Sequence, residues 1–479
     1  MHTKYIDTIQ HNMIDNTAEL SEEELAKEIQ KRNPNLPVQY WFKNRYAGMK
    51  YADHCAAFPS LLDVKYNNIY WQYLKTSQGT FYLYSAYYDN RYLVKNKPVI
   101  RILTMYDSLD INVTIHCQIW LNNRKTPVFS EVSQKLKIWD DRWGNNKEGV
   151  PRPYLLTCKI PSEIENELPE AVSLVHDAAC IYAKTLLRVI DNRPENGGLK
   201  KGIAVCVKGL DYMHSDLSVQ LVEWLELLSV VGADKVFMYV YEAHPNVTKV
   251  LQHYAKRGFL DVTPITLPGG QPNLKDLRHW FHKGRIMAKR QNELIPYNDC
   301  LYRNIHNYKF ISLLDTDEII MPKSATNWHE LIEQLIDKSG GSTDSYYFRN
   351  VYFMDSMREL AGWAPGIPKY MHKTQNVYRS TVYTKQQEYI KCFHDTDRVE
   401  TVHNHFSMSC LEGGCKWYPV HTDDGHLQHY RNECVAELKP KCDQFRNNIT
   451  KDASIWRFKD QLVHRTVKTL KILGFLDDL

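Results

Sequence analysis

Strand-like and helix-like segments alternate between residues 202 and 314, and this alternation constrains the fold more than any other feature. Short apolar runs predict strands, and segments with apolar residues three or four apart predict helices, two of which end at Gly232 and Gly258. The predicted strands are 202–208, 235–241, 259–267 and 308–314, and the helices between them are 216–231, 247–256 and 285–295. Strands separated by helices pair in parallel, so the pattern predicts an α/β fold with a doubly wound, mostly parallel sheet.

Two carboxylates follow the last of these strands directly. The apolar run at 308–314 leads into Asp315-Thr-Asp317. Ligands of open α/β sheets bind just beyond the carboxyl ends of the strands. Acids at positions i and i+2 share a face there and hold a divalent cation through oxygen. Because a diphosphate leaving group needs such a cation, the pattern favours a nucleotide-sugar transferase; the alternative is a solvated turn after a strand.

The same three residues occur again at Asp395-Thr-Asp397. Roughly one chance copy of so short a motif is expected in a chain of this length, so the motif alone is weak evidence. The preceding residues, 391–394, do not have the pattern of a buried strand. We therefore interpret the second copy as a solvated turn.

Length and composition narrow the class of protein. The chain has 479 residues, which suits two or three domains, and 43% of them are apolar, which is enough for a large core. The formal net charge of +4 is nearly neutral for this length and gives no case for a nucleic-acid-binding protein. The 31 Tyr, 15 Phe and 11 Trp suit sugar-binding clefts and large β-rich cores equally.

Cysteines and glycosylation motifs point to a secretory lumen. The chain has 11 cysteines, an odd number, and five of them crowd the C-terminal third: Cys392, Cys410, Cys415, Cys434 and Cys442. We expect disulfides among them. Asn112, Asn246 and Asn448 each begin an Asn-x-Thr sequence, although about two or three arise by chance. No run of eighteen apolar residues occurs, so the expectation is either a cytosolic protein or an anchor upstream of this sequence.

The N-terminal part has a different pattern. Residues 1–64 are predicted to be an N-terminal extension, loosely ordered up to about residue 35 except for one amphipathic helix over 18–31, in which Ser21 and Glu24 make a capping box. Residues 65–190 form a β-rich domain, predicted to be a sandwich over 65–165 with a helix over 168–190. A linker at 191–198 leads to the main domain, 199–460, and a C-terminal tail, 461–479.

Several signatures in the main domain resemble those of the family-92 glycosyltransferases. In order along the chain they are Cys206-Val-Lys208, residues 223–232, Tyr254-Ala-Lys-Arg-Gly258, and Gln291 leading through 298–303 into Leu314-Asp-Thr-Asp-Glu-Ile319. The ordered set covers about 120 residues and is far more specific than any single piece. Weaker matches at 402–406 and 429–431 extend the resemblance to roughly half of the chain.

The resemblance implies a GT-A fold, a UDP-sugar donor (UDP-galactose first), a glycan acceptor on a glycoprotein or polysaccharide, Mn²⁺ as cofactor, and inversion at the anomeric carbon. It also implies a type II membrane protein of the Golgi, although no anchor is visible in this sequence. Membrane contact is therefore expected only through an anchor outside this chain. Some relatives carry an N-terminal carbohydrate-binding sandwich, and residues 65–165 are the matching segment.

The resemblance assigns metal and donor roles. Asp315 and Asp317 are the expected ligands of the cation, and Asp315 is also expected to bind the UDP-sugar. Glu318 either completes the acidic cluster or turns into the sheet and holds the loop. His405 is the expected third metal ligand, with His403 sharing its strand face. Two carboxylates and an imidazole suit Mn²⁺.

The remaining roles rest on chemistry. Inversion needs a general base, for which Asp355 and Glu359 are the predicted residues and Asp344 a further candidate; a surface carboxylate is the alternative for each. Cations near the diphosphate are predicted at Lys208, Arg303 and Arg431. The basic segment 275–290 suits phosphate contact, and it suits a solvated helix face or a mobile loop just as well.

Two other functions fit parts of the pattern. One is a non-catalytic glycan-binding protein that uses the β domain on a decayed transferase scaffold, against which the intact Asp315/Asp317 pair argues. The other is a metal-dependent phosphodiester hydrolase, which needs more clustered His and Asp ligands than the sequence shows.

Overall fold

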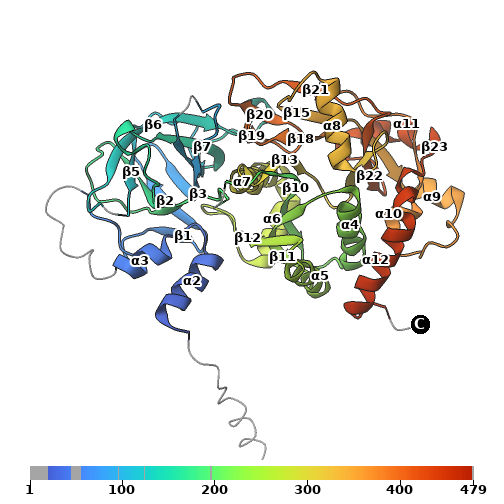
Figure 1. The fold of residues 1–479 in the computed structure, drawn as a ribbon, viewed down its shortest axis with the longest axis horizontal. Helices are drawn as coiled ribbons and strands as arrows, with labels where there is room; N and C mark the ends of the chain where they lie inside the picture. Colours follow the sequence, from blue (N-terminus) through green and yellow to red (C-terminus); the bar gives the residue numbers. More distant parts are fainter. Residues whose placement is uncertain (1–19, 45–55, 95–96, 123, 195–196, 477–479) are drawn as a thin grey trace, which may run out of the picture.

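The computed structural model describes residues 20–44, 56–94, 97–122, 124–194 and 197–476. Figure 1 shows two bodies side by side, an N-terminal β body and a larger body that contains both strands and helices. Two helices, α2 (Glu22–Arg32) and α3 (Val38–Asn44), lie beside the β body. The predicted capping box is confirmed, because Ser21 Oγ accepts from the backbone N–H of Glu24 at 3.3 Å while Glu24 Oε2 accepts from that of Ser21 at 2.9 Å.

The N-terminal β body is a closed barrel. Its strands are β1 (Tyr66–Asn68), β2 (Trp71–Lys75), β3 (Thr80–Asp89), β4 (Val99–Tyr106), β5 (Ile115–Trp120), β6 (Val128–Lys137), β7 (Arg152–Lys159), β8 (Ala171–His176) and β9 (Leu187–Ile190). The strand order is β1-β2-β3-β4-β7-β6-β5-β8-β9, and a pairing of β3 with β9 closes the ring. The predicted β-sandwich is therefore wrong.

The closing strands lie where the sequence predicted a helix. Residues 168–190 form β8 and β9 instead, and Ala86 and Tyr87 of β3 pair with Val189 and Ile190 of β9. Strands as short as β8 and β9 have too few residues to tell helical from strand periodicity, and closure of the barrel depends on contacts distant in sequence. The barrel interior is packed with apolar side chains, including Ile100, Ile102 and Ile115.

The larger body is built on a seven-stranded mixed sheet. Its order is β12 (Leu260–Pro264), β11 (Lys235–Ala243), β10 (Lys201–Tyr212), β13 (Tyr308–Leu313), β18 (Lys391–Asp395), β15 (Ser345–Phe348) and β21 (Trp417–Pro419). The first four strands are parallel, but β18 runs antiparallel to both β13 and β15. A second sheet, in the order β14 (Glu318–Pro322), β22 (Gly425–Arg431), β16 (Asn350–Met354), also contains an antiparallel pair. The expected GT-A fold with a doubly wound, mostly parallel sheet is therefore wrong. Periodicity locates strands but does not give their direction.

Helices cover the two faces of the large sheet. One face, with Ile203, Val205 and Val207 of β10, packs against α4 (Ser218–Val231), α5 (Pro245–Lys256), α8 (Trp328–Lys338) and α12 (Lys459–Ile472). The other face, with Ala204 and Cys206, packs against α7 (Ile286–Asn304) and against barrel residues. The smaller elements are α6 (Lys275–Gly284), α9 (Asp355–Ala361), α10 (His372–Gln375), α11 (Cys442–Arg446), β17 (Tyr378–Ser380), β19 (Val399–Val402), β20 (Ser407–Cys410) and β23 (Ile449–Lys451).

The direction of β18 also determines where the second Asp-x-Asp motif, Asp395-Thr-Asp397, lies. Residues 391–394 belong to a fully buried strand, so the prediction that no buried strand precedes Asp395 is wrong. Because β18 is antiparallel to β13, Asp395 pairs with Phe310 and its end of the strand lies at the edge opposite Asp315. Asp397 lies in the turn after β18, is 59% exposed, and forms an ion pair with Lys200 at 2.6 Å.

Polar contacts join the barrel to the larger body. Tyr87 of the barrel and Tyr239 of β11 both donate to the buried carboxylate of Asp299 on α7, and Arg303 Nε donates to the same group at 2.7 Å.

Within the described part of the chain, no helix is long and apolar enough to cross a membrane.

Disulfides confirm the expectation from the cysteine pattern. Four pairs are Cys117–Cys158, Cys206–Cys300, Cys410–Cys415 and Cys434–Cys442, while Cys392 is a buried free thiol. The Cys206–Cys300 bond joins β10 to α7 across 94 residues of sequence, whereas Cys410–Cys415 spans 5.

We expect the double variant Cys206→Ala/Cys300→Ala to lose more stability than Cys410→Ala/Cys415→Ala. The chain-entropy model gives about 4.7 kcal/mol for a loop of the first size and about 2 kcal/mol for the second. Urea unfolding of the oxidised proteins measures both. Equal losses would show that loop closure does not set the contribution of these bonds.

Candidate functional site

A cavity opens where four elements of the larger body meet. It has a volume of about 800 Å³ and is lined by residues that include Lys208, Asp315, His405 and Arg431. Lys208 comes from β10, Asp315 from the loop after β13, His405 from the loop between β19 and β20, and Arg431 from the end of β22. The structure therefore brings together four of the predicted site residues.

Asp315 is held between two lysines. Its Oδ1 lies 3.0 Å from Lys208 Nζ and its Oδ2 lies 3.6 Å from Lys391 Nζ. Burial alone raises the pKa of a carboxyl, but the two ammonium groups outweigh it and lower the pKa of Asp315 below its usual range. Asp315 is therefore ionised at neutral pH.

Glu318 turns into the sheet and holds the loop. Its side chain is 3% exposed, its Oε2 accepts from the backbone N–H of Asp315 at 3.0 Å, and it lies 3.1 Å from Lys391 Nζ. Burial raises the pKa of Glu318. The second of the two alternatives from the sequence is therefore correct for this residue.

Asp317 faces solvent more than Asp315 does. Its side chain is 39% exposed, and its Oδ2 lies 3.4 Å from Nε2 of His429. Burial lowers the pKa of His429, but the carboxylates of Asp317 and Glu318 outweigh it and raise the pKa overall. The backbone of Tyr430 donates to the carbonyl of Asp317 at 2.9 Å, which fixes the loop against β22.

His405 has the form of a neutral imidazole. Burial and the charge of Lys391 lower the pKa of His405 to about 3. Its Nδ1 lies 2.9 Å from the carbonyl oxygen of Ile390, so Nδ1 carries the proton and Nε2 keeps its lone pair. His403 packs instead against Trp143, with ring centroids 4.7 Å apart.

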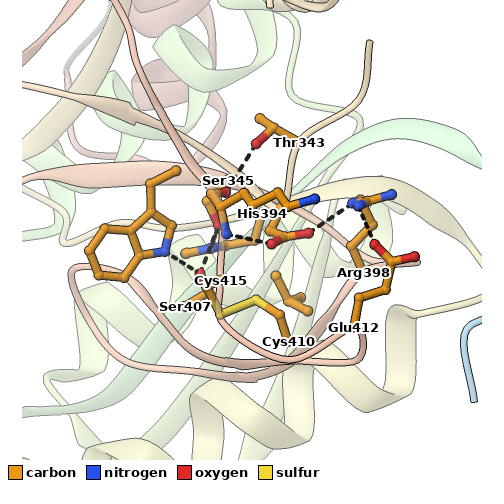
Figure 2. The surroundings of a disulfide bond; sticks show 12 residues. Thr343, Ser345, His394, Arg398, Ser407, Cys410, Glu412 and Cys415 are labelled. Atoms are coloured by element: carbon orange, nitrogen blue, oxygen red, sulfur yellow. Dashed lines mark hydrogen bonds and ion pairs between the residues drawn. A yellow bond between two sulfur atoms is a disulfide. The ribbon is translucent and has the colours of Figure 1, made fainter.

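The three expected metal ligands do not form a closed protein site. Among the described residues, the one group of three side chains with ligand atoms within 4.8 Å of one another is Asp344, Cys410 and Cys415. Figure 2 shows that these cysteines are joined in a disulfide, so they cannot bind a metal as thiolates. In the same region Arg398 donates to Asp344 at 2.8 Å, which makes Asp344 a structural residue rather than a base.

Other predicted residues lie apart from the cavity. Arg303 is at the end of α7, which leads to the start of β13 and hence to the edge opposite Asp315; it binds Asp299 and the side-chain oxygen of Asn35. Glu359 on α9 is 67% exposed and lies 3.7 Å from Arg358. Asp355 lies at the start of α9 and lines a neighbouring cavity with Asp317.

Three residues with roles at the site were missed from the sequence. Lys391 and His429 come from strands whose direction and pairing the sequence does not give, and His372 begins a short helix in an irregular stretch. The family-like segment His429-Tyr-Arg431 was a signal for His429. For Lys391, an isolated lysine before an apolar run gives no signal.

Comparison with known families identifies the larger body. The model of glycosyltransferase family 92 matches residues 201–466, which is more than half of the chain. The chain belongs to glycosyltransferase family 92. It is therefore a glycosyltransferase, and it takes a sugar from a donor to an acceptor. A search among curated proteins returned no significant match. The matched segment contains the Asp315/Asp317 loop, Lys391, His405 and His429 of this family-92 member.

We expect Lys391→Met to destabilise the protein by about 3–5 kcal/mol, because it leaves the buried Glu318 without its nearest cation. The Lys391 side chain is 0% exposed and lies 3.1 Å from Glu318. Urea unfolding measures the change, with the exposed Lys385→Met as the matched control. A loss no larger than that of the control would contradict a stabilising role for this pair.

Proposed function

We propose that this family-92 glycosyltransferase transfers a hexose, with galactose as the leading candidate, from a UDP-sugar to a hydroxyl of a glycan. The transfer inverts the anomeric carbon and uses a divalent cation. The observation that carries the proposal is the ionised Asp315, which follows a parallel strand and lines a cavity of about 800 Å³, with Asp317 two residues further along in the neighbouring cavity. Lys208 and Arg431 line the same cavity, so a diphosphate has cations on two sides.

The residues present fit a divalent cation such as Mn²⁺. Asp315 and Asp317 supply carboxylate oxygens, and His405 supplies an Nε2 lone pair because its Nδ1–H is directed to a carbonyl. These ligand atoms do not all lie within 4.8 Å of one another, so the diphosphate oxygens would supply further ligands. The cation would neutralise charge on the departing nucleoside diphosphate.

The chain's own groups do the remaining chemistry. Lys208 holds Asp315 in place and adds positive charge near the diphosphate, and Arg431 adds charge from the side of β22. Of the two predicted bases, Asp355 lines a cavity next to Asp317, whereas Glu359 lines neither cavity. We therefore assign to Asp355 the proton of the acceptor hydroxyl.

We also propose that the protein works in the lumen of the secretory pathway, as the Golgi enzymes of the family imply. Four disulfides among the described residues support an oxidising compartment. Asn112 and Asn448 are exposed, as a glycan acceptor has to be.

We expect wild-type protein with Mn²⁺ to release UDP from UDP-galactose faster than from UDP-glucose or UDP-N-acetylglucosamine, and EDTA to abolish the release. Asp317→Asn removes a ligand charge and should lower the rate by about a hundredfold or more. The matched control is Asp397→Asn, which changes the second Asp-x-Asp motif at the opposite edge of the sheet and should leave the rate unchanged.

Calorimetry with UDP and Mn²⁺ gives a second readout, because binding does not require turnover. A wild type that neither releases UDP from these three donors nor binds UDP contradicts the proposed function. Equal losses in Asp317→Asn and Asp397→Asn would show that the first motif has no special role.

A further inference from the structure

The Asp315-Thr316-Asp317 loop separates two cavities. The first is the donor cavity described above, which Asp315 lines. The second has a volume of about 950 Å³ and is lined by Asp317 and Asp355. Thr316, Tyr212 and Arg431 line both cavities. A ligand in the second cavity would therefore lie one short loop away from a ligand in the first.

The second cavity holds a paired carboxylate and imidazole. His372 at the start of α10 places its Nε2 2.6 Å from Oδ1 of Asp355 at the start of α9. Both side chains are about one-quarter exposed, at 25% and 26%, so the pair is open to a ligand. Oδ2 of Asp355 makes no hydrogen bond with any residue that the structure describes, and this oxygen is left for a proton from a ligand.

The cavity wall also suits a polyhydroxyl ligand. Lys373 is 2% exposed, and its ammonium makes no hydrogen bond or ion pair within the described part of the chain, although it lines the cavity. The ring of Tyr430 lies in the same wall, 6.0 Å from this ammonium. The ammonium lies over the face of the Tyr430 ring, which is itself 2% exposed, so the wall offers the hydroxyls of a sugar a hydrogen-bond donor rather than an open aromatic face.

We propose that this second cavity is the acceptor-sugar subsite, and that His372 is a positioning residue that holds Asp355 for its role as base. The inference rests on the proposed function and assigns the place of its second substrate. In the transfer step, the acceptor oxygen bonds to the anomeric carbon while the bond from that carbon to the diphosphate oxygen breaks. The diphosphate leaves with the electron pair, and the hydroxyl proton goes to Oδ2 of Asp355.

The hydrogen bond from His372 sets the charge state of the base. This bond is the largest cause of the lowered pKa of Asp355, and it outweighs the effect of partial burial. Arg358 on α9 also lowers the pKa of Asp355. The other charged groups that line the same cavity are Lys373, Asp317, Arg431, Glu433 and Lys439. Without His372 the pKa of Asp355 rises, so Asp355 is protonated, and inactive as a base, up to a higher pH.

The test compares donor hydrolysis with transfer in four proteins: wild type, Asp355→Asn, His372→Ala and His372→Gln. UDP release from UDP-galactose with Mn²⁺ is measured alone and with methyl fucoside or methyl galactoside as the probe acceptor, and the glycoside product is measured by mass spectrometry. We expect Asp355→Asn to lower the formation of the glycoside product by about a hundredfold, and His372→Ala to lower it by about tenfold.

The pH profile separates positioning from mere structural support. In His372→Ala the acid limb of the transfer profile should move to higher pH, because the pKa of Asp355 rises. In His372→Gln, whose side-chain amide still donates to Asp355, the limb should stay near that of wild type. Circular dichroism confirms that each variant is folded.

Each outcome decides the inference. Transfer that is unchanged in His372→Ala, or an acid limb that does not move in that variant, overturns the positioning role alone. Hydrolysis that neither glycoside converts to transfer in the wild type overturns the acceptor subsite. A wild type with no UDP release and no UDP binding refutes the proposed function itself.

Discussion

The site depends on a balance of buried charge at the end of β13. Asp315, Glu318 and Asp317 lie within four residues of sequence, and such a cluster of acids repels itself in a partly buried setting. Other strands supply the compensating cations: Lys208 from β10, Lys391 from β18 and His429 from β22. Because these three strands lie in two different sheets, the carboxylates are placed correctly only when both sheets have formed. The charge balance is thus a product of the tertiary fold and not of the loop sequence.

Much of the local structure could be predicted from the sequence. The strands β10, β11 and β13 and the helices α4 and α5 lie within a few residues of their predicted positions, since long periodic segments and glycine ends are local signals. The same local signals did not predict how the strands pair or in which direction they run. Strand β9 closes the barrel by pairing with β3, and β18 runs antiparallel to β13. Neither pairing can be predicted from a short window of residues.

The grouping of the candidate residues in space was predictable to the same degree. Asp315, Asp317, Lys208, Arg431 and His405 follow or flank recognisable motifs, and the structure gathers them around neighbouring cavities. Arg303 shows the limit of such reasoning: it stands within a family-like segment, yet its place near the C-terminal end of a helix sets it at the far edge of the sheet. Lys391 and His372 act through partners that are 73 and 17 residues away, and single-sequence patterns do not register such pairs.

The hydrogen bond between Asp299 and the barrel determines which part of the chain can fold independently. The sequence shows a boundary at the linker 191–198, and the family match begins at residue 201. Yet Asp299 is fully buried, and one of the hydroxyls that hydrogen-bond to it comes from Tyr87 on the barrel. Cutting the chain at the linker would remove that hydroxyl and uncover the apolar face of α7 that now packs on barrel residues. The shortest stable fragment with the transferase site is therefore set by folding rather than by homology, and it includes the barrel.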